Sequence, residues 1–483
     1  MAVKKQKIRI GWASCDITPS QKTTLCGQFH TRVSKGVLDP VTATALALES
    51  ADHKTRTILI SIDAAFVADY TRARFDKAVR RLLPDVPAEN IVIHATHTHT
   101  APTQPCYFIF QDVPDKTVIK PAAYGRFLAQ RLARLAVAVW KKRAWGAVAW
   151  GYGQAVVSYN RRAAYMDGSS VMYGATNDPM FSHMEGHENH AVDMLFTYDV
   201  RHQLTGMMLN VPCPSQCTEH LEVVSADYWH ETRVELRRRF GEKLFVLPQC
   251  GAAGDLSPHL MINRAAQARM FQLKGLMKDA RSFDMAQRQE IALRIAQAVA
   301  EALPACAHDI RDQVELAHAY SLLQIPLRKL TPADVRVCEE RIGFFTQEVA
   351  NFARRRVSPF NVGHSSCIGQ RGYYQHELEL HRAMEAGRVP PMPVHLHAVR
   401  IGDMAVATNQ FEYLLDFAER IKARSPAVQT CVAQLAGEGT YLATERAERG
   451  GGYGAWFAST ALDHHGGQQI VEESLRQLAG LWR

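Results

Sequence analysis

Asn90-Ile-Val-Ile-His-Ala-Thr-His-Thr-His-Thr-Ala-Pro102 is an apolar, β-branched stretch that ends in two histidines one residue apart. Alternate residues of a strand lie on one face, so the apolar side chains of this stretch are expected to share a face with His97 and His99. Imidazole is a common zinc ligand, and a rigid strand end can fix two of them. An ordinary polar strand end has the same pattern, so other parts of the sequence are needed to show whether these histidines belong to a metal or catalytic site.

The composition is that of a large globular protein. The 483 residues are 47% apolar and 22% charged. No apolar run approaches the roughly 20 residues of a membrane-spanning helix, and the first residues lack the apolar core of a secretory signal. The ten cysteines are scattered, as is usual for reduced thiols. We therefore expect a cytoplasmic protein with no transmembrane segment.

The charge pattern does not favour a nucleic-acid partner. The net charge is +8, from 56 Lys and Arg against 48 Asp and Glu residues. The arginine triplets at 237–239 and 354–356 lie on expected amphipathic helices without interleaved aromatic residues, which favours a solvated helix face. Whether the chain forms a homo-oligomer is left open by the sequence.

Strand and helix patterns alternate through the first half of the chain. Strands are expected at 8–13, 43–49, 57–63, 147–158, 191–198, 205–211 and 244–248 and before His97, and helices at about 71–83, 122–142 and 228–239. Further helices are expected at about 286–303, 332–356, 375–386 and 412–422, strands at 397–408 and 428–435, and a helix that ends at Trp482. The polar segment 160–189 is expected to be a long functional loop.

No Pro/Gly/Ser-rich linker divides the chain. We therefore predict an α/β fold with a mixed central sheet and flanking helices, in a single large domain. This domain would span residues 1–483 and carry helical insertions at about 260–390.

Four further segments place reactive side chains at strand ends or in glycine-rich turns, where catalytic groups are often presented. They are 210–216, which sets Cys213 between two prolines; 254–259, with Asp255 and Ser257; 408–413, with Glu412; and 441–444, which begins with Tyr441, twelve residues before Tyr453. Asp63, at an expected strand end, is either a turn residue or an acceptor for a metal-bound imidazole.

In their order along the chain, these segments resemble the neutral/alkaline zinc-dependent ceramidases and their bacterial relatives. The matching motifs are Asp16-Ile-Thr-Pro19, Asp39-Pro40, Ser61-Ile-Asp-Ala64, Thr96-His-Thr-His99, Asn160-Arg161, Gly254-Asp-Leu-Ser-Pro258 and Tyr441-Leu-Ala-Thr444. The resemblance extends over essentially the whole chain. The ceramidases are longer, with a C-terminal β-sandwich domain for which we expect no counterpart here.

The resemblance implies one Zn²⁺ per chain, or another divalent metal, and suggests His97, Cys213, Glu412 and Tyr441 as its ligands. Two of these positions depart from the family. Cys213 stands where the family has a second zinc histidine, and Gln410-Phe-Glu412 replaces Gly-Glu-Phe, so that Glu412 would reach the metal from a helix start. Cys213 is alternatively a buried core residue, and Glu412 alternatively stabilises a helix dipole.

The same resemblance implies roles for other residues. The expected catalytic residues are His99, Arg161, Ser257 and Tyr453, and the expected substrate-binding residues are Arg161, Asp255, His259 and His190. His183 and His187 lie near His190, and substrate contacts or solvation are expected there instead of a second metal.

We therefore expect a zinc-dependent hydrolase that cleaves an amide or related acyl bond of a polar, sugar-derived substrate through metal-activated water. One alternative is a metal-dependent lyase or other carbohydrate-active enzyme on the same scaffold. Another is a non-catalytic binding protein.

Overall fold

The main sheet is mixed and has nine strands, most of which are the alternating or continuous apolar runs of the sequence. The computed structural model describes residues 3–106 and 113–483. Strand order is β14 (Phe245–Cys250), β13 (Leu204–Val211), β12 (Ala191–Asp199), β7 (Ala144–Gln154), β1 (Gln6–Asp16), β3 (Thr42–Ser50), β4 (Arg56–Ile62) and β5 (Ile91–Ala95), with β16 (Gln313–Val314) beside β1. The β4–β5 and β13–β14 pairs are parallel and the others antiparallel.

A second sheet packs against one face of the first. It consists of β17 (Leu316–Ile325), β18 (Met392–Ile401), β19 (Met404–Thr408) and β21 (Gln429–Ala433). Trp12 and Leu195 of the first sheet join Val399 and Val406 of the second in one buried apolar cluster. Alternate residues of the same strands face the other way, which is the period-2 pattern of strands buried on both faces.

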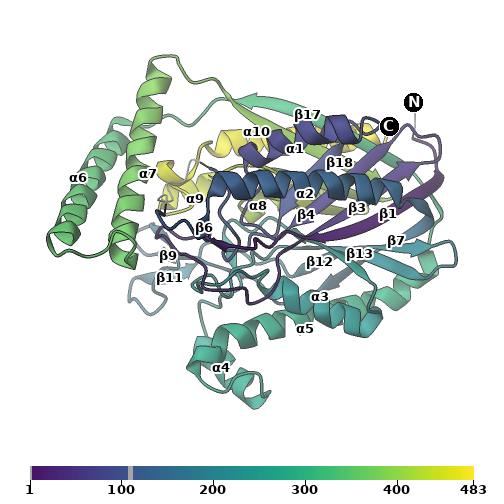
Figure 1. Cartoon of the computed structure of the whole chain (residues 1–483), viewed down its shortest axis with the longest axis horizontal. Coiled ribbons are helices and arrows are strands. Elements are labelled where there is room, and N and C mark those ends of the chain that lie inside the picture. Colours follow the sequence, from purple (N-terminus) through teal and green to yellow (C-terminus); the bar gives the residue numbers. More distant parts are fainter. Residues whose placement is uncertain (1–2, 107–112) are drawn as a thin grey trace.

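Helices cover the two outer faces. Against the first sheet lie α1 (Asp69–Leu82), α2 (Pro121–Lys141), α3 (Tyr228–Phe240) and α5 (Phe283–Cys306), and against the second lie α8 (Leu415–Arg424) and α10 (His464–Leu481). The result is a helix–sheet–sheet–helix arrangement (Figure 1). This confirms the predicted α/β fold with a mixed central sheet.

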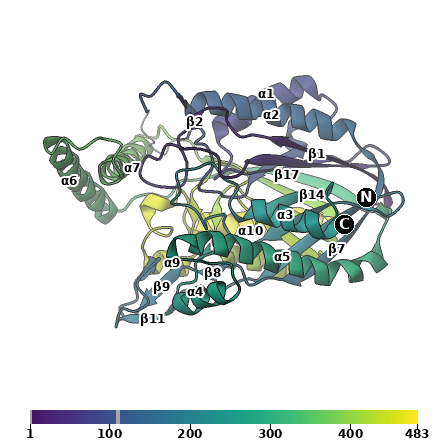
Figure 2. The same cartoon turned by 60° about the horizontal axis from the view of Figure 1, so that its bottom comes forward.

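Three further helices lie in long chain segments that connect strands and do not cover either sheet. They are α4 (Arg264–Leu273), α6 (Pro332–Arg354) and α7 (Val362–Glu385). The α6–α7 hairpin projects from one end of the molecule in Figures 1 and 2. It touches the body at Gly369, where a Cβ atom would lie 2.5 Å from the backbone oxygen of Phe29. Only glycine permits this close approach of α7 to the segment that carries Phe29.

Three expected elements were wrong. The single strand expected at 397–408 is instead the end of β18 and all of β19, which pair with each other around a turn at 402–403. Segment 160–189 is not one long loop, because β9 (Arg162–Tyr165) pairs with β10 (Ser170–Met172) and β11 (Phe181–Met184). The helix expected from residue 412 begins at Leu415. Before it, β20 (Glu412–Tyr413) pairs in parallel with β22 (Tyr441–Leu442), so pairing with a segment about 30 residues away prevails over local helical periodicity.

Short elements complete the chain between the main layers. They are β2 (Lys22–Thr23), β6 (Val118–Ile119), β8 (Tyr159–Asn160), β15 (Leu256–Ser257) and α9 (Glu445–Gly450). Single 3₁₀ turns lie at 88–90, 280–282, 307–309 and 457–459.

The C-terminal ends of the parallel strand pairs meet in one region. Gly251, just after β14, bridges to Ala433 at the end of β21, and the Gln434 amide donates to the backbone oxygen of Cys250 at 3.0 Å. Ala95, at the end of β5, donates its amide to Leu435 at 3.2 Å. Loops that follow parallel strands at such an edge commonly form binding sites.

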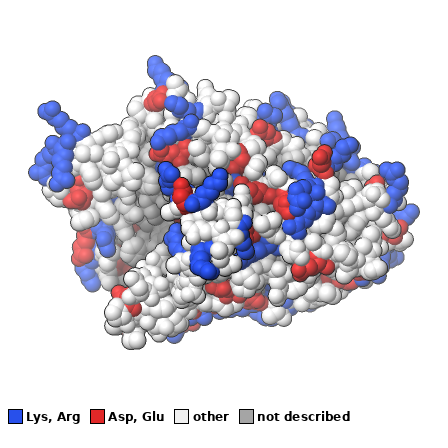
Figure 3. Space-filling model, turned by 90° about the horizontal axis from the view of Figure 1, so that it is seen from below, with Lys and Arg blue, Asp and Glu red and all other residues white. Residues whose placement is uncertain are grey.

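The surface carries both charge signs. In the view of Figure 3, Lys and Arg are interspersed with Asp and Glu and form no continuous basic face. Arg238 and Arg239 of the first arginine triplet pair with Glu235 on the same helix at 2.7 and 2.6 Å. Within residues 3–106 and 113–483, no helix is both long and apolar enough to cross a membrane.

Asp63 follows β4 and is wholly buried. Both of its oxygens accept from the Arg233 guanidinium of α3, at 2.8 and 2.9 Å, and Oδ2 also accepts from the Thr42 amide. Asp63 therefore joins α3 to the sheet, and it is not the residue that binds the His97 ring.

We predict that Arg233→Met lowers the free energy of unfolding by about 3–5 kcal/mol, because it leaves Asp63 as an unpaired buried charge. Arg238→Met on the same helix removes only the exposed ion pair with Glu235 and should change the free energy of unfolding by less than about 1 kcal/mol. Denaturant titrations followed by circular dichroism measure both values, and equal effects of the two changes would contradict the assignment.

Candidate functional site

His97 lies two residues beyond the end of β5 and has a positive φ of 64°, so the alternation of the strand does not continue to it. Its Nδ1 lies 2.7 Å from the backbone oxygen of Ala65 and its Nε2 lies 3.2 Å from Oε2 of Glu412. Since a carbonyl oxygen only accepts, Nδ1 carries a proton and Nε2 is directed into the site. Burial opposes charging of this ring, but the carboxylate of Glu412 outweighs it and raises the pKa of His97.

Glu412 reaches this point from strand β20, and its neighbour in the paired strand β22 is Tyr441. Burial would raise the pKa of Glu412, but His97 and Arg161 outweigh burial and hold the pKa at about 2. The phenol of Tyr441 also helps to lower the pKa of the Glu412 carboxylate. Glu412 is therefore an anion at neutral pH.

Arg161 lies between these groups and is only 2% exposed. Its Nη2 donates to the Tyr441 hydroxyl at 3.3 Å and to the backbone oxygen of Gly254 at 2.9 Å, and lies 4.0 Å from Oε2 of Glu412. Its Nη1 donates to Gln216 at 3.1 Å. Burial opposes its charge, but the neighbouring oxygens of Tyr441 and Glu412 more than compensate and raise its pKa.

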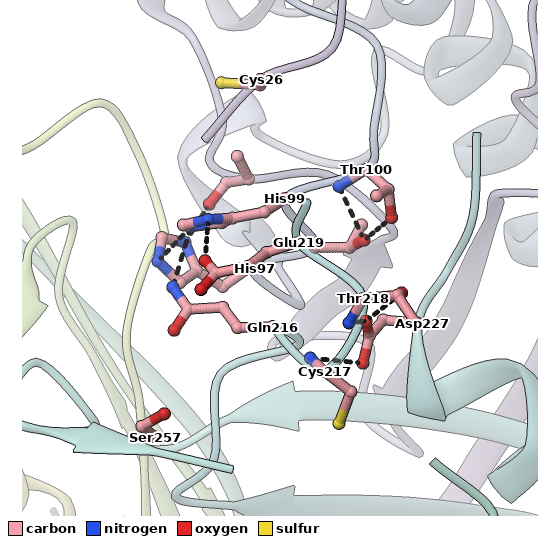
Figure 4. A network of polar contacts seen from close by, with 12 residues as sticks. Cys26, His97, His99, Thr100, Gln216, Cys217, Thr218, Glu219, Asp227 and Ser257 are labelled. Atoms are coloured by element: carbon pink, nitrogen blue, oxygen red, sulfur yellow. Dashed lines mark hydrogen bonds and ion pairs between the residues drawn. The ribbon is translucent and has the colours of Figure 1, made fainter. Parts of the chain in front are cut away.

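His99 lies beside His97, with their Nε2 atoms 3.3 Å apart. The Nε2 of His99 lies 2.8 Å from Nε2 of Gln216, and its Nδ1 lies 3.0 Å from Oε2 of Glu219 (Figure 4). Gln216 and Glu219 belong to the loop after β13. Burial is the main cause that lowers the pKa of His99.

The polar side chains described above form one side of a pocket whose other walls are apolar and aromatic. The lining residues include Phe29, Phe66, Tyr373 and Tyr453 together with His97, His99, Glu412 and Tyr441. The ring of Tyr453 lies edge-on to Tyr441 and to Phe29, with centroids 5.3 and 5.5 Å apart. Gly27, with φ of 100°, passes over His99 where a Cβ atom would lie 2.3 Å from the ring.

The structure thus brings together six of the residues chosen from the sequence: His97, His99, Arg161, Glu412, Tyr441 and Tyr453. The phenol of Tyr453 stays protonated at neutral pH because burial raises its pKa. These residues come from five separate segments of the chain, so the site depends on the whole fold.

The structure does not bring Cys213 to this group. The strand β13 ends at Val211, and Cys213 then turns into the apolar core with Val157 and Tyr228. Its thiol donates to the backbone oxygen of Val157 at 3.3 Å, and burial raises its pKa well above the usual value. This placement corrects the expected ligand position, because Gln216 and Glu219, later in this loop, are the side chains that contact His99.

Arg161 contacts Tyr441 but is not part of the pocket lining, and four other expected site residues also lie outside it. Ser257 bonds the Tyr173 hydroxyl at 2.9 Å, and His259 donates from Nε2 to the backbone oxygen of Gln216 at 2.9 Å. Asp255 accepts from the Leu415 amide at 2.9 Å and so fixes the start of α8. His190 lies 3.5 Å from Glu188 on the surface. Asp255 therefore supports the structure around the site, and His190 is not part of the site.

Sequence reasoning missed Gln216, Glu219, Phe29 and Tyr373. Gln216 ends a segment that the sequence marked for its cysteine, but neither polar residue has a distinctive local pattern. The two aromatic residues come from a loop and from the inserted helix α7 and meet only in the fold, where their ring centroids are 5.8 Å apart.

The chain shares its fold with solved neutral ceramidases. The neutral ceramidase from Pseudomonas aeruginosa superposes with a TM-score of 0.71 and 16% sequence identity over 99% of this chain and 74% of the other. A ceramidase complexed with C2 superposes with a TM-score of 0.68 and 14% identity, over 99% of this chain and 75% of the other. No protein-family model and no curated protein matches the sequence.

We predict that Cys213→Ser still folds, because the serine hydroxyl can donate to the backbone oxygen of Val157. Its free energy of unfolding should be about 1–3 kcal/mol lower, because a more polar group is buried in the core. Cys213→His must overpack the core and should lower it by about 3 kcal/mol or more. Denaturant titration and metal analysis of both variants check this. A Cys213→Ser protein that loses a metal which Cys213→His retains would contradict the core assignment.

Proposed function

We propose that this protein hydrolyses an amide or related acyl bond of a small molecule. The observation that carries the proposal is the convergence of His97, Glu412 and Tyr441 at one end of an apolar pocket, on the fold of the neutral ceramidases. Arg161 supports this group through its bond to Tyr441. The apolar walls suit an acyl group. We also propose a polar, sugar-derived group on the amine side of the scissile bond.

The donor atoms agree in chemistry with a divalent cation such as Zn²⁺. The proton on Nδ1 of His97, held by Ala65, leaves Nε2 as the nitrogen that could bind a metal. Imidazole, carboxylate and phenol form a three-ligand set that leaves one position open. In the described part of the chain, no group of three or more His, Cys, Asp and Glu side chains is arranged to hold a metal ion, so Tyr441 is an essential member of the set.

We therefore propose His97, Glu412 and Tyr441 as the residues that would hold the metal. A bound divalent cation supplies Lewis-acid chemistry, which lowers the pKa of water and polarises a carbonyl group. Arg161, already charged and buried, would hold Tyr441 and Glu412 in place.

Tyr453 and His99 have complementary tasks in the proposed reaction. The protonated phenol of Tyr453 lines the pocket and can donate to the oxyanion that develops as water adds to the carbonyl carbon. His99, which also lines the pocket, can accept a proton from the attacking water and return it to the leaving nitrogen. An acid and an amine are then the products.

The proposal is tested by incubating the protein and Zn²⁺ with N-acyl amides of graded acyl length, including acylated amino sugars, and measuring the amine released. We expect release from at least one amide with an apolar acyl group. No release from any member, by protein shown to be folded and metal-loaded, would contradict the proposed function.

His97→Ala should abolish metal binding and leave the fold intact, because this residue lies beyond the strand and adds little to the core. His183→Ala, at an exposed histidine of β11, is the matched control and should keep the wild-type metal content. Elemental analysis after dialysis measures the stoichiometry. If His97→Ala retained a full equivalent of metal, His97 would not be a ligand.

Tyr453→Phe should lower kcat by about 10²–10³-fold with little change in KM, because an oxyanion donor acts mainly in the transition state. Tyr165→Phe removes a hydroxyl that donates to Ala175 on the surface, and it should leave both constants unchanged. Steady-state kinetics on the best amide decide the point, and an unaltered kcat in Tyr453→Phe would exclude the role.

A further inference from the structure

Helices α1 and α2 lie side by side on the outer face of the first sheet (Figures 1 and 2). A groove of about 430 Å³ lies between them. Residues three, four and seven positions apart share one face of a helix, and the lining residues follow this spacing. They are Arg74, Lys77, Ala78 and Arg81 from α1 and Arg126, Ala129 and Gln130 from α2. Four cationic side chains and no acidic side chain therefore line the groove.

The protein itself does not balance this charge. Near α1, Asp76 pairs with Arg72 at 2.9 Å and Glu89 pairs with Arg80 at 2.5 Å, and none of these four residues lines the groove. Helix α2 contains no Asp or Glu. In the part of the chain that the structure describes, none of the four cations of the groove forms an ion pair. The groove is therefore a concentration of uncompensated positive charge.

One tyrosine holds two of the arginines. The guanidinium carbon of Arg74 lies 3.3 Å from the centre of the Tyr70 ring, and its Nη1 donates to the backbone oxygen of Tyr70 at 3.2 Å. Nη1 of Arg126 donates to the Tyr70 hydroxyl at 3.3 Å. Each guanidinium has five N–H donors, and these contacts use one of each. Tyr70 therefore orients two like charges without a carboxylate and leaves most of their donors for another acceptor.

Lys77 and Arg81 extend the positive charge along α1. Lys77 lies three residues after Arg74 and four before Arg81, and like charges at these spacings destabilise a helix. All three side chains are exposed, so water screens this repulsion. Arg126 adds a fourth cation from the opposite wall. Two helices thus direct N–H donors toward one volume, which an anion would stabilise.

We propose that the groove between α1 and α2 binds a small molecule that carries two or more phosphate or sulfate groups. Arginine binds such groups through two parallel N–H···O bonds, and lysine adds a compact point charge. A single carboxylate would balance only one of the four positive charges. The volume of the groove lies in the range of small-molecule sites, roughly 300–1,000 Å³. This site shares no lining residue with the pocket of His97, and it does not depend on the proposed function.

Two larger polyanions match the groove less well. A bilayer surface is flat, so it would meet exposed cations outside the groove, such as Arg134 of α2, as readily as those inside it. Single-stranded nucleic acid stacks its bases on aromatic rings. The rings of Tyr70 and Phe127 already carry Arg74 and Arg131, whose guanidinium carbons lie 3.3 and 5.3 Å from the ring centres. The concave shape and the occupied rings therefore favour a compact ligand.

Isothermal titration calorimetry with tripolyphosphate at about 0.15 M salt tests the proposal. We expect one saturable site per chain. Arg74→Met, Lys77→Met and Arg126→Met should each weaken binding about tenfold or more, because each removes a charge that faces the ligand. Arg126→Lys keeps the charge without the planar fork and should lose only part of the affinity. Arg134→Met removes the same charge from α2 outside the groove and should weaken binding less than about twofold. Circular dichroism shows whether each variant is folded.

Three results would overturn the proposal. The first is the absence of saturable binding. The second is an equal loss of affinity in Arg134→Met and Lys77→Met, which would show that only diffuse surface charge attracts the anion. The third is loss of binding in His97→Ala, which would place tripolyphosphate at the proposed metal; we expect this variant to bind as the wild type does.

The larger polyanions are tested on the same variants. Vesicles of phosphatidylcholine with phosphatidylserine are sedimented with the protein, and a single-stranded DNA oligonucleotide is titrated into it. We expect any binding of either to be weakened as much by Arg134→Met as by Lys77→Met. If a protein that does not bind tripolyphosphate bound one of them and lost it only in Lys77→Met, the groove would belong to that polyanion, and the small-molecule site would be refuted.

Discussion

The guanidinium of Arg161 is the group on which the arrangement of the site depends. It is buried, and its contacts extend to Glu412, Tyr441, Gln216 and the backbone of Gly254, which belong to four different segments. A buried cation is costly unless it is paired and hydrogen-bonded, so these contacts must form together. The ionised Glu412 in turn faces His97, which joins the end of β5 to the same network.

The two packed sheets explain how this network comes into being. The C-terminal ends of β5, β14 and β21 meet through backbone bonds, such as the one from Gln434 to Cys250 at 3.0 Å. The parallel β20–β22 pair then places Glu412 beside Tyr441. The inserted helix α7 adds Tyr373 to the opposite wall, so one polar end and one apolar end are presented to the same ligand.

Much of the fold could be predicted from periodicity, because most strands of the first sheet are buried on both faces and read as apolar runs. Strand β17 of the second sheet, which is only partly buried, was not predicted. The local pattern failed where pairing is distant, as at Glu412, which is in a strand and not at a helix start. For the site, ordered motifs found His97, Arg161 and Tyr441. Glu219 could not be found, because its partner His99 lies 120 positions away and its importance comes from that contact.

The identity of the reaction is tested most directly by the source of oxygen in the product. The best amide from the screen is incubated with the metal-loaded protein in water enriched in ¹⁸O, and the products are analysed by mass spectrometry after a single turnover. The account predicts one solvent oxygen in the carboxylic acid and none in the amine. An unsaturated product without solvent oxygen would show elimination and contradict it.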